Sequence, residues 1–101
     1  MELKRVVVTG LGAITPLGHN VADTWAAVVD GVSGAGPITR FDTSLFKTQF
    51  ACEVKDFDPS LYFDRKEARK YDRYAQYAVI AAKEGVEDSG LDFEKVNKNR
   101  V

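Results

Sequence analysis

The sequence predicts an α/β domain built on a parallel sheet, and three observations support this prediction. Residues 6–8 are consecutive valines, which cannot alternate between a buried and an exposed face and so indicate a strand covered on both sides. Gly10 and Gly12 follow at once, and glycines there allow a sharp turn or the close approach of another backbone. Asn20 then opens a helical pattern. The chain therefore begins with a strand, a glycine-rich turn and a helix.

The same order of elements occurs in dinucleotide-binding folds, whose fingerprint needs glycines at its first, third and sixth positions. Gly10 and Gly12 fill the first two positions, but Thr15 occupies the last one and Pro16 follows it. No acidic residue ends a second strand about 20 residues later, where a ribose ligand is expected. The two glycines are better explained as the exit of a central strand from a crowded sheet.

Composition limits the chain to one globular domain at most, with 101 residues, of which 45% are hydrophobic and 29% charged. The net charge of −1 gives no overall field, so we expect neither nucleic acid nor a membrane as partner. Cys52 is the only cysteine, which excludes an internal disulfide and fits a cytoplasmic location. We expect no signal peptide, and no apolar run reaches the roughly 20 residues of a membrane helix.

A first helix is predicted from Asn20, a suitable N-cap, to Gly31, a suitable C-terminal glycine. Asp23 would lie near the positive end of this helix. We expect Trp25 to anchor its apolar face in a core. The apolar residues at helical spacing are Val21, Ala22, Trp25, Ala26, Val28 and Val29.

The middle of the chain is predicted to be less regular. Residues 34–37 are expected to form a loop and residues 42–44 a turn. Residues 50–54 predict a short, partly exposed strand near a sheet edge. Residues 58–60 predict a turn or the start of a helix.

The second half is predicted to be helical, with start signals at Asp64, paired with Glu67, and again at Asp72. Residues 74–86 are apolar nearly all round, which predicts a helix surrounded by protein. Small residues on one face of it would let another element pack closely: Ala78, Ala81, Ala82 and Gly85. Residues 89–90 end this helix, and residues 97–101 could lead into another strand.

The sequence predicts two strands and three or four helices in all. These elements are too few to cover both faces of the strand at residues 6–8 and every side of the helix at residues 74–86. We therefore interpret the chain as the opening part of a larger domain. The alternative is a compact α/β domain whose helix is simply rich in alanine.

Nucleophilic and metal chemistry are not expected in this chain. Cys52 lies in an apolar run, which is typical of an inert buried thiol, and His19 lies in a polar turn. A structural zinc site needs four ligands of these kinds, and the chain has one histidine and one cysteine. We predict no catalytic residue, no metal and no cofactor here.

A cationic stripe is the better functional signal. Five basic residues share a face if the helix is continuous: Arg65, Lys66, Arg69, Lys70 and Arg73. Like charges at this spacing repel by roughly a few tenths of a kcal/mol per pair, so the stripe indicates an anionic partner. The alternative is a solvated helix face, with Asp64, Glu67 and Asp72 offsetting part of the charge.

The chain resembles the β-ketoacyl-acyl-carrier-protein synthases, and the elongating type II enzyme most. The likeness runs through the whole chain in order and with the spacings of that family. Its segments are RVVVTGLG at 5–12, TPLG at 15–18, TW at 24–25, FD at 41–42, RKEARKYDR at 65–73 and DSGL at 88–91.

The resemblance implies a thiolase-like fold, an α-β-α-β-α sandwich of duplicated halves, with residues 1–101 as the N-terminal part of the first half. It implies an acyltransferase of fatty acid biosynthesis that condenses acyl chains with malonyl-acyl-carrier protein by a decarboxylative Claisen reaction. It also implies a cytoplasmic homodimer that needs no cofactor. In that family a cysteine at a helix N-terminus carries the acyl chain and two histidines assist decarboxylation, a chemistry that suits a helix dipole and paired backbone amides.

The family's catalytic residues match no position in this chain, which covers about the first quarter of the family's length. Cys52 inherits no role, and the chain alone is not expected to catalyse condensation. One site does carry over. The family segment that docks the acidic acyl carrier protein matches Arg65, Lys66, Arg69 and Lys70.

Two other interpretations stay open. The chain could belong to a polyketide ketosynthase, or to a chain-length partner that has lost its cysteine. It could also be a non-catalytic docking module for an acidic carrier protein. The partners that the resemblance to the synthases implies are acyl carrier protein and acyl and malonyl thioesters.

Overall fold

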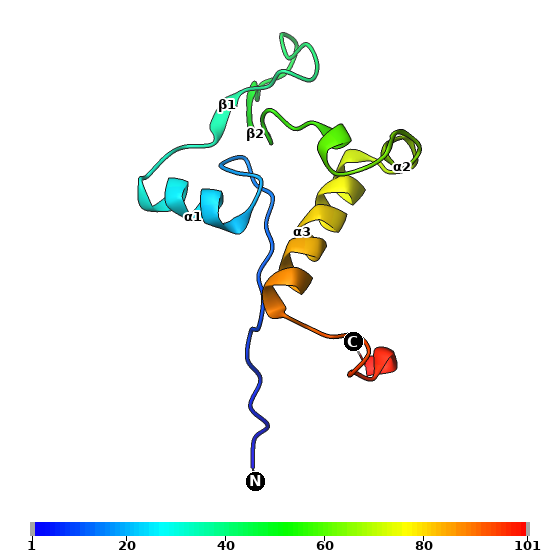
Figure 1. Cartoon of the computed structure of the whole chain (residues 1–101). Coiled ribbons are helices and arrows are strands. Elements are labelled where there is room, and N and C mark those ends of the chain that lie inside the picture. Colours follow the sequence, from blue (N-terminus) through cyan, green and yellow to red (C-terminus); the bar gives the residue numbers. More distant parts are fainter. Residues whose placement is uncertain (1, 101) are drawn as a thin grey trace.

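The computed structural model describes residues 2–100, and helix α3 (Arg73–Ser89) is its longest element. Figure 1 shows α3 crossing the molecule, with the N-terminal segment running beside its C-terminal end. The other elements in chain order are α1 (Val21–Val29), β1 (Ala35–Pro37), β2 (Phe50–Cys52), the 3₁₀ turn η1 (Pro59–Leu61), α2 (Arg65–Lys70) and the 3₁₀ turn η2 (Lys98–Arg100). None of these helices combines the length and the apolar character that crossing a bilayer requires.

The N-terminal valines do not form the predicted strand. Val6 is 92% exposed, and its two neighbours are exposed as well. A strand exists only through hydrogen bonds to a neighbouring strand, and nothing in the part of the chain that the structure describes pairs with residues 6–8. Residues 2–100 therefore supply no parallel neighbour for residues 6–8, which agrees with the expectation that these residues alone cannot cover a doubly buried strand.

The sheet within residues 2–100 is a small antiparallel pair of β1 and β2. Ala35 pairs with Cys52 and Pro37 with Phe50. The short strand expected at residues 50–54 is confirmed for its first three residues, whereas residues 34–37, expected as a loop, contribute β1 instead. Cys52 is exposed, so its expected burial is wrong, because a two-stranded sheet leaves both of its faces uncovered.

Close packing on the small-residue face of α3 is confirmed. Gly10 and Gly12 lie directly against this face, and a Cβ on Gly12 would collide with the Ala81 carbonyl and reach 2.7 Å from the Gly85 amide nitrogen. The Leu11 amide donates to Asp88 Oδ2 at 3.0 Å in the same stretch. The two glycines therefore serve a backbone-to-helix approach, not an exit from a sheet.

Helix α1 begins and ends as predicted. Asn20 Oδ1 accepts a hydrogen bond of 2.8 Å from the Asp23 amide, and Gly31 follows the helix with φ of +70°. The expected burial of Trp25 is wrong, because its side chain is 65% exposed in the part of the chain that the structure describes.

The core of the described residues is small. Phe63 and Ile80 are its buried apolar residues, and Gln76 is its buried polar one. Tyr74 is 75% exposed, so residues 2–100 do not enclose the apolar run at 74–86, in agreement with the expectation that they cannot surround it by themselves. The radius of gyration is 17.7 Å, against about 13 Å for a compact domain of this length, so the compact-domain alternative is also wrong for these residues.

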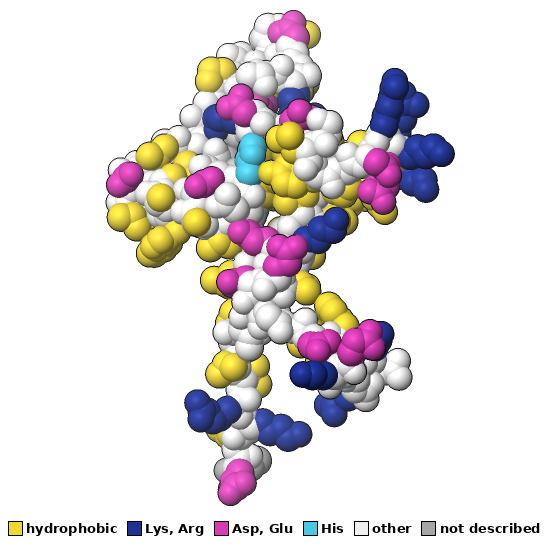
Figure 2. All heavy atoms as spheres, in the orientation of Figure 1, with side chains coloured by type: hydrophobic (Ala, Val, Ile, Leu, Met, Phe, Trp, Pro, Cys, Tyr) yellow, Lys and Arg dark blue, Asp and Glu magenta, His cyan; other side chains and the backbone are white. Residues whose placement is uncertain are grey.

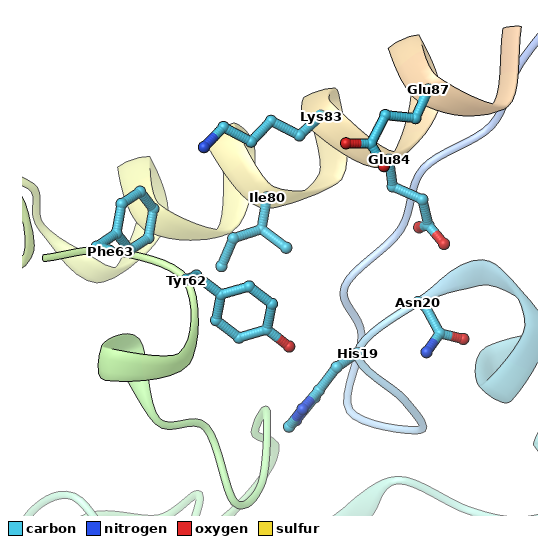
Figure 3. Close-up of a pocket in the computed structure, with 8 residues that line it drawn as sticks. All are labelled: His19, Asn20, Tyr62, Phe63, Ile80, Lys83, Glu84 and Glu87. Carbon is cyan, nitrogen blue, oxygen red and sulfur yellow. The ribbon is translucent and has the colours of Figure 1, made fainter. Parts of the chain in front are cut away.

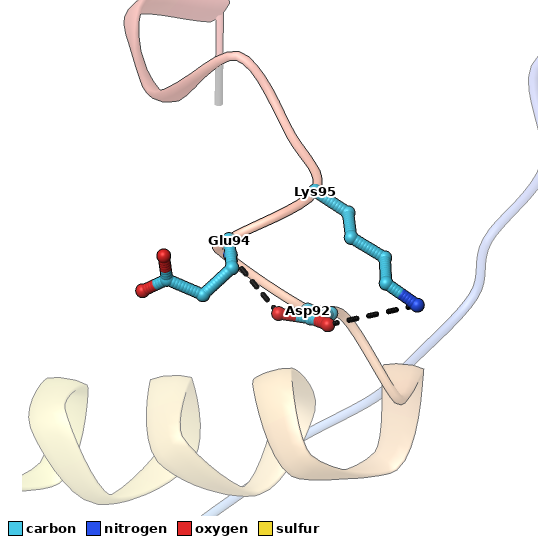
Figure 4. A network of polar contacts seen from close by, with 3 residues as sticks. All are labelled: Asp92, Glu94 and Lys95. Carbon is cyan, nitrogen blue, oxygen red and sulfur yellow. Dashed lines mark hydrogen bonds and ion pairs between the residues drawn. The ribbon is translucent and has the colours of Figure 1, made fainter.

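The turns and ends of the second half follow local rules. Asp42 Oδ1 accepts from the Ser44 amide at 3.0 Å, as expected for the predicted turn. Gly90 ends α3 with φ of +66°. After it, Asp92 Oδ1 accepts from the Glu94 amide at 3.0 Å and Asp92 Oδ2 lies 3.9 Å from Lys95 Nζ (Figure 4). Residues 98–100 form η2, and residue 101, where the further strand was expected to begin, lies outside the described residues.

Candidate functional site

Helix α2 carries the four predicted site residues and is set off from α3 by a sharp break. Asp64 caps its start, with Oδ1 accepting from the Glu67 amide at 2.8 Å. Tyr71 ends it with φ of −107° and ψ of 130°, which is extended backbone. Asp72 then precedes α3 without a side-chain capping bond. Both predicted helix starts are confirmed, but the single continuous helix that would align five basic residues is not formed.

The four residues expected to dock a carrier protein stay together on α2, and all four are exposed. They are Arg65, Lys66, Arg69 and Lys70. Figure 2 shows Lys and Arg side chains projecting from the end of the molecule where Figure 1 places α2. Arg73, in contrast, begins α3, and its guanidinium lies 5.0 Å from the centre of the Phe57 ring, in cation–π contact.

These four cations have no carboxylate partner among residues 2–100. The ion pair found in that part of the chain is Lys95 with Asp92, on a different segment. The Asp64 carboxylate is already engaged as the cap of α2. Acidic neighbours therefore do not neutralise the cations of α2 by direct pairing, and the helix presents net positive charge to solvent.

Residues beneath α2 fix its position on α3. Gln76, 4% exposed, donates from Nε2 to the Ala68 carbonyl oxygen at 3.0 Å. The Phe63 ring packs against Tyr71, with 6.0 Å between ring centres, and Lys83 Nζ lies 5.9 Å from the centre of the Phe63 ring. The cationic helix is thus tied to the small core at both of its ends.

A cavity of about 310 Å³ lies between α3, the end of η1 and the residues before α1 (Figure 3). His19 borders it, but His19 Nε2 donates a hydrogen bond of 2.6 Å to the Lys55 carbonyl oxygen, because a carbonyl oxygen can only accept. This nitrogen is therefore not free to act as a base. Glu84 also borders the cavity and accepts bonds from backbone amides. Cys52 does not line it, so the cavity assembles no pair of nucleophile and base. Residues 2–100 bring no three potential metal-binding side chains together.

Two supporting residues were not identified from the sequence. Gln76 and Glu84 both interrupt the apolar run of α3, and both bond to backbone groups of other segments. A polar residue inside an otherwise apolar helical run was the signal that could have revealed them, because such a residue needs a partner when it is covered.

Asp58 begins η1, and its pKa is lowered chiefly by the hydrogen bond from Ser60 Oγ and then by that from the Ser60 amide. A depressed folded-state pKa stabilises the fold above the unfolded pKa, and this contribution is lost as pH falls through the folded pKa. We expect Ser60→Ala to raise the pKa of Asp58 toward its ordinary value, as measured by NMR titration of the carboxyl carbon. An unchanged Asp58 pKa in that variant would show that the hydroxyl does not hold it down.

Comparison with known proteins identifies the family of the chain. Residues 3–101 match the family model "Beta-ketoacyl synthase, N-terminal domain". The 3-oxoacyl-[acyl-carrier-protein] synthase 2 of Coxiella burnetii is 52% identical over the whole chain, and that of Synechocystis sp. is 46% identical. The chain spans about a quarter, 24%, of the length of each of these curated relatives.

Solved structures give the same result for the fold. The ishigamide ketosynthase/chain length factor matches with a TM-score of 0.75 and 42% identity, over 90% of this chain and 23% of that one. A type II PKS acyl-carrier protein in complex with its ketosynthase bound to the hexaketide matches with a TM-score of 0.69 and 30% identity, over 97% of this chain and 24% of that one. The predicted thiolase-like α/β fold is thereby confirmed for the part that the chain spans. The chain belongs to the β-ketoacyl synthase family, whose N-terminal domain it matches from residue 3 to residue 101.

Proposed function

We propose that this chain is the N-terminal part of the first thiolase-like half of a 3-oxoacyl-[acyl-carrier-protein] synthase. The intact enzyme would condense acyl chains with malonyl-acyl-carrier protein by decarboxylative Claisen chemistry in fatty acid elongation, as a cytoplasmic homodimer. The support is identity of 52% and 46% to two curated synthases along the full length of this chain. Residues 1–101 supply none of the cysteine and histidine residues of that chemistry, so their contribution is structural and binding.

The binding contribution that we propose is the docking of the acidic acyl carrier protein on α2. The observation that carries it is the set of exposed cations on α2 with no ion-pair partner among residues 2–100: Arg65, Lys66, Arg69 and Lys70. A cluster of uncompensated positive charge raises the encounter rate with an acidic partner and orients it on arrival. Because Gln76 and Phe63 hold α2 in place, little ordering of the backbone is required when the carrier binds.

A second candidate function has a specific observation in its favour. One solved structure described above, at 30% identity, is titled a type II PKS acyl-carrier protein in complex with its ketosynthase, and the other, at 42% identity, is titled a ketosynthase/chain length factor. A polyketide ketosynthase would use the same kind of carrier protein on the same helix. Product mass separates the two, because an elongating fatty acid enzyme adds one malonyl-derived unit to each acyl chain it is given, whereas a polyketide enzyme repeats the addition without reduction of the product.

Charge reversal on α2 tests the docking role directly. We expect Lys66→Glu combined with Arg69→Glu to raise the KM of the intact enzyme for acyl-carrier-protein substrate about tenfold at low salt. Each surface charge pair contributes up to about 1 kcal/mol, and about 1.4 kcal/mol corresponds to tenfold. The effect should shrink as salt is added, since exposed charges are screened within about 10 Å at 0.1 M.

The matched control applies the same change of charge away from α2. Lys47→Glu combined with Lys98→Glu alters two exposed lysines, one in the loop before β2 and one in η2. This control should leave the KM for the carrier substrate within about twofold at each salt concentration. Equal effects from both double variants would mean that net charge, and not α2, attracts the carrier. No effect from either at low salt would overturn the docking role.

A further inference from the structure

A groove runs beside the cationic helix, between η1 and α2. Its volume is about 430 Å³. The buried ring of Phe63 and the half-buried methyl group of Ala68 contribute apolar surface to it, together with Pro59. Arg65 and Arg69 border it on the α2 side. An apolar depression thus lies within reach of two of the four cations.

The acidic groups at the groove are already engaged. Asp58 Oδ1 accepts from both the amide and the hydroxyl of Ser60, at 2.9 and 2.7 Å. Asp64 Oδ1 accepts from the Glu67 amide as the cap of α2. Neither aspartate lies within ion-pair distance of a groove arginine among residues 2–100. The groove therefore combines an apolar interior with arginines that remain available to external carboxylates.

Resting on the docking role proposed above, we propose that this groove receives one apolar side chain from the acyl carrier protein, flanked by carboxylates that pair with Arg65 and Arg69. Charge complementarity selects this occupant, because an acidic helix brings an apolar residue and its neighbouring carboxylates together at helical spacing. Long-range attraction brings the carrier to α2, and the apolar insertion then fixes its register there.

The size of the groove suits this role. An enclosed cavity of about 150 Å³ lined by apolar side chains is enough to hold benzene, so 430 Å³ of open groove accommodates a leucine or methionine side chain. Desolvated apolar anchors are the usual centres of binding energy at protein interfaces, while charges at the rim act more on encounter. The two contributions should therefore respond differently to salt.

The test is calorimetric titration of the intact enzyme with acyl carrier protein at several salt concentrations. Ala68→Leu places a larger side chain in the groove, whereas Ala68→Ser leaves it open. We expect Ala68→Leu to weaken binding five- to tenfold, with the same slope of log Kd against log salt as the parent enzyme. Ala68→Ser should bind within about twofold of the parent. Lys70→Gln, which changes a cation that does not line the groove, should weaken binding and flatten the slope.

The outcomes separate the groove from the docking role. Loss of affinity in Lys70→Gln with parent-like binding by Ala68→Leu would overturn the groove and leave docking on α2 intact. Parent-like binding by both variants would overturn the docking role, and the groove with it. Should Ala68→Leu fail to fold, Ala68→Cys labelled with an environment-sensitive fluorophore replaces it. A blue shift on adding carrier protein supports insertion into the groove, and an unshifted emission overturns it.

Discussion

Replacing Gly12 by alanine should destabilise the intact protein by about 3 kcal/mol or more. A Cβ at this position would collide with the Ala81 carbonyl and lie 2.7 Å from the Gly85 amide nitrogen. Both obstacles are backbone atoms of α3, which cannot rotate away as a flexible side chain can. Relief requires the N-terminal segment to move off the helix, and overpacking of this kind typically costs about 1–3 kcal/mol even where side chains can adjust.

The matched control is the same substitution at Gly36, in β1, where an added Cβ meets no atom within 4 Å. Gly36→Ala should be neutral or slightly stabilising, because alanine restricts the unfolded chain at a position without positive φ. Thermal unfolding of the intact protein compares the two variants, and we expect a lower midpoint for Gly12→Ala alone. Similar midpoints would mean that the segment does not press against α3 as closely as the structure has it.

Elements governed by neighbouring residues could be predicted from the sequence. The Asn20 and Asp64 caps formed because each side chain reaches an amide three residues ahead, which is a purely local geometry. Gly31 and Gly90 adopted positive φ after their helices for the same local reason. Short-range hydrogen bonding therefore determines where these helices begin and end, whatever the remainder of the protein provides.

Elements that depend on distant partners could not be predicted in this way. Residues 6–8 have the composition of a central strand, yet Val6 is 92% exposed, because hydrogen-bonded neighbours and not composition make a strand. Trp25 has the pattern of a core residue and is exposed for the same reason. The β-ketoacyl synthase relatives described above are about four times as long as this chain. Residues 2–100 provide no strand to pair with residues 6–8 and leave Trp25 exposed.

The candidate site was predictable in its chemistry but not in its exact extent. Basic residues at spacings of three and four indicated one cationic face. The break at Tyr71 removed Arg73 from that face, and the start signal at Asp72 indicated it although no proline marks the position. Gln76 was one of the few polar residues in an apolar run, and its bond to Ala68 across the break depends on tertiary geometry. The basic residues of the site could therefore be predicted from the sequence, whereas the contacts that hold their helix in place could not.

Glu84→Ala should destabilise the intact protein by about 2–4 kcal/mol. Glu84 Oε1 accepts from the Ala13 amide at 2.9 Å, and both carboxylate oxygens lie within 3.2 Å of the Val21 amide nitrogen. Val21 is the first residue of α1, so the carboxylate also lies at the positive end of that helix dipole. Hydrogen bonds to a charged group contribute about 1.5–3 kcal/mol each, reduced here because the site is only half-buried. One side chain of α3 thereby fixes both the N-terminal segment and the start of α1.

Glu87→Ala is the control for this prediction, because Glu87 lies one turn from Glu84 on α3, is exposed and has no side-chain hydrogen bond among residues 2–100. The thermal midpoint of Glu87→Ala should match that of the parent, because a surface substitution usually changes the free energy of unfolding by no more than about 0.5 kcal/mol.

Glu84→Gln keeps an acceptor oxygen but loses the charge, so its midpoint should fall between those of the parent and Glu84→Ala. A Glu84→Gln midpoint equal to that of Glu84→Ala would assign the whole effect to charge at the α1 terminus. Equal midpoints for the alanine variants at 84 and 87 would instead contradict a bridging role for Glu84, because the unpaired amides of Ala13 and Val21 would then carry no measurable cost.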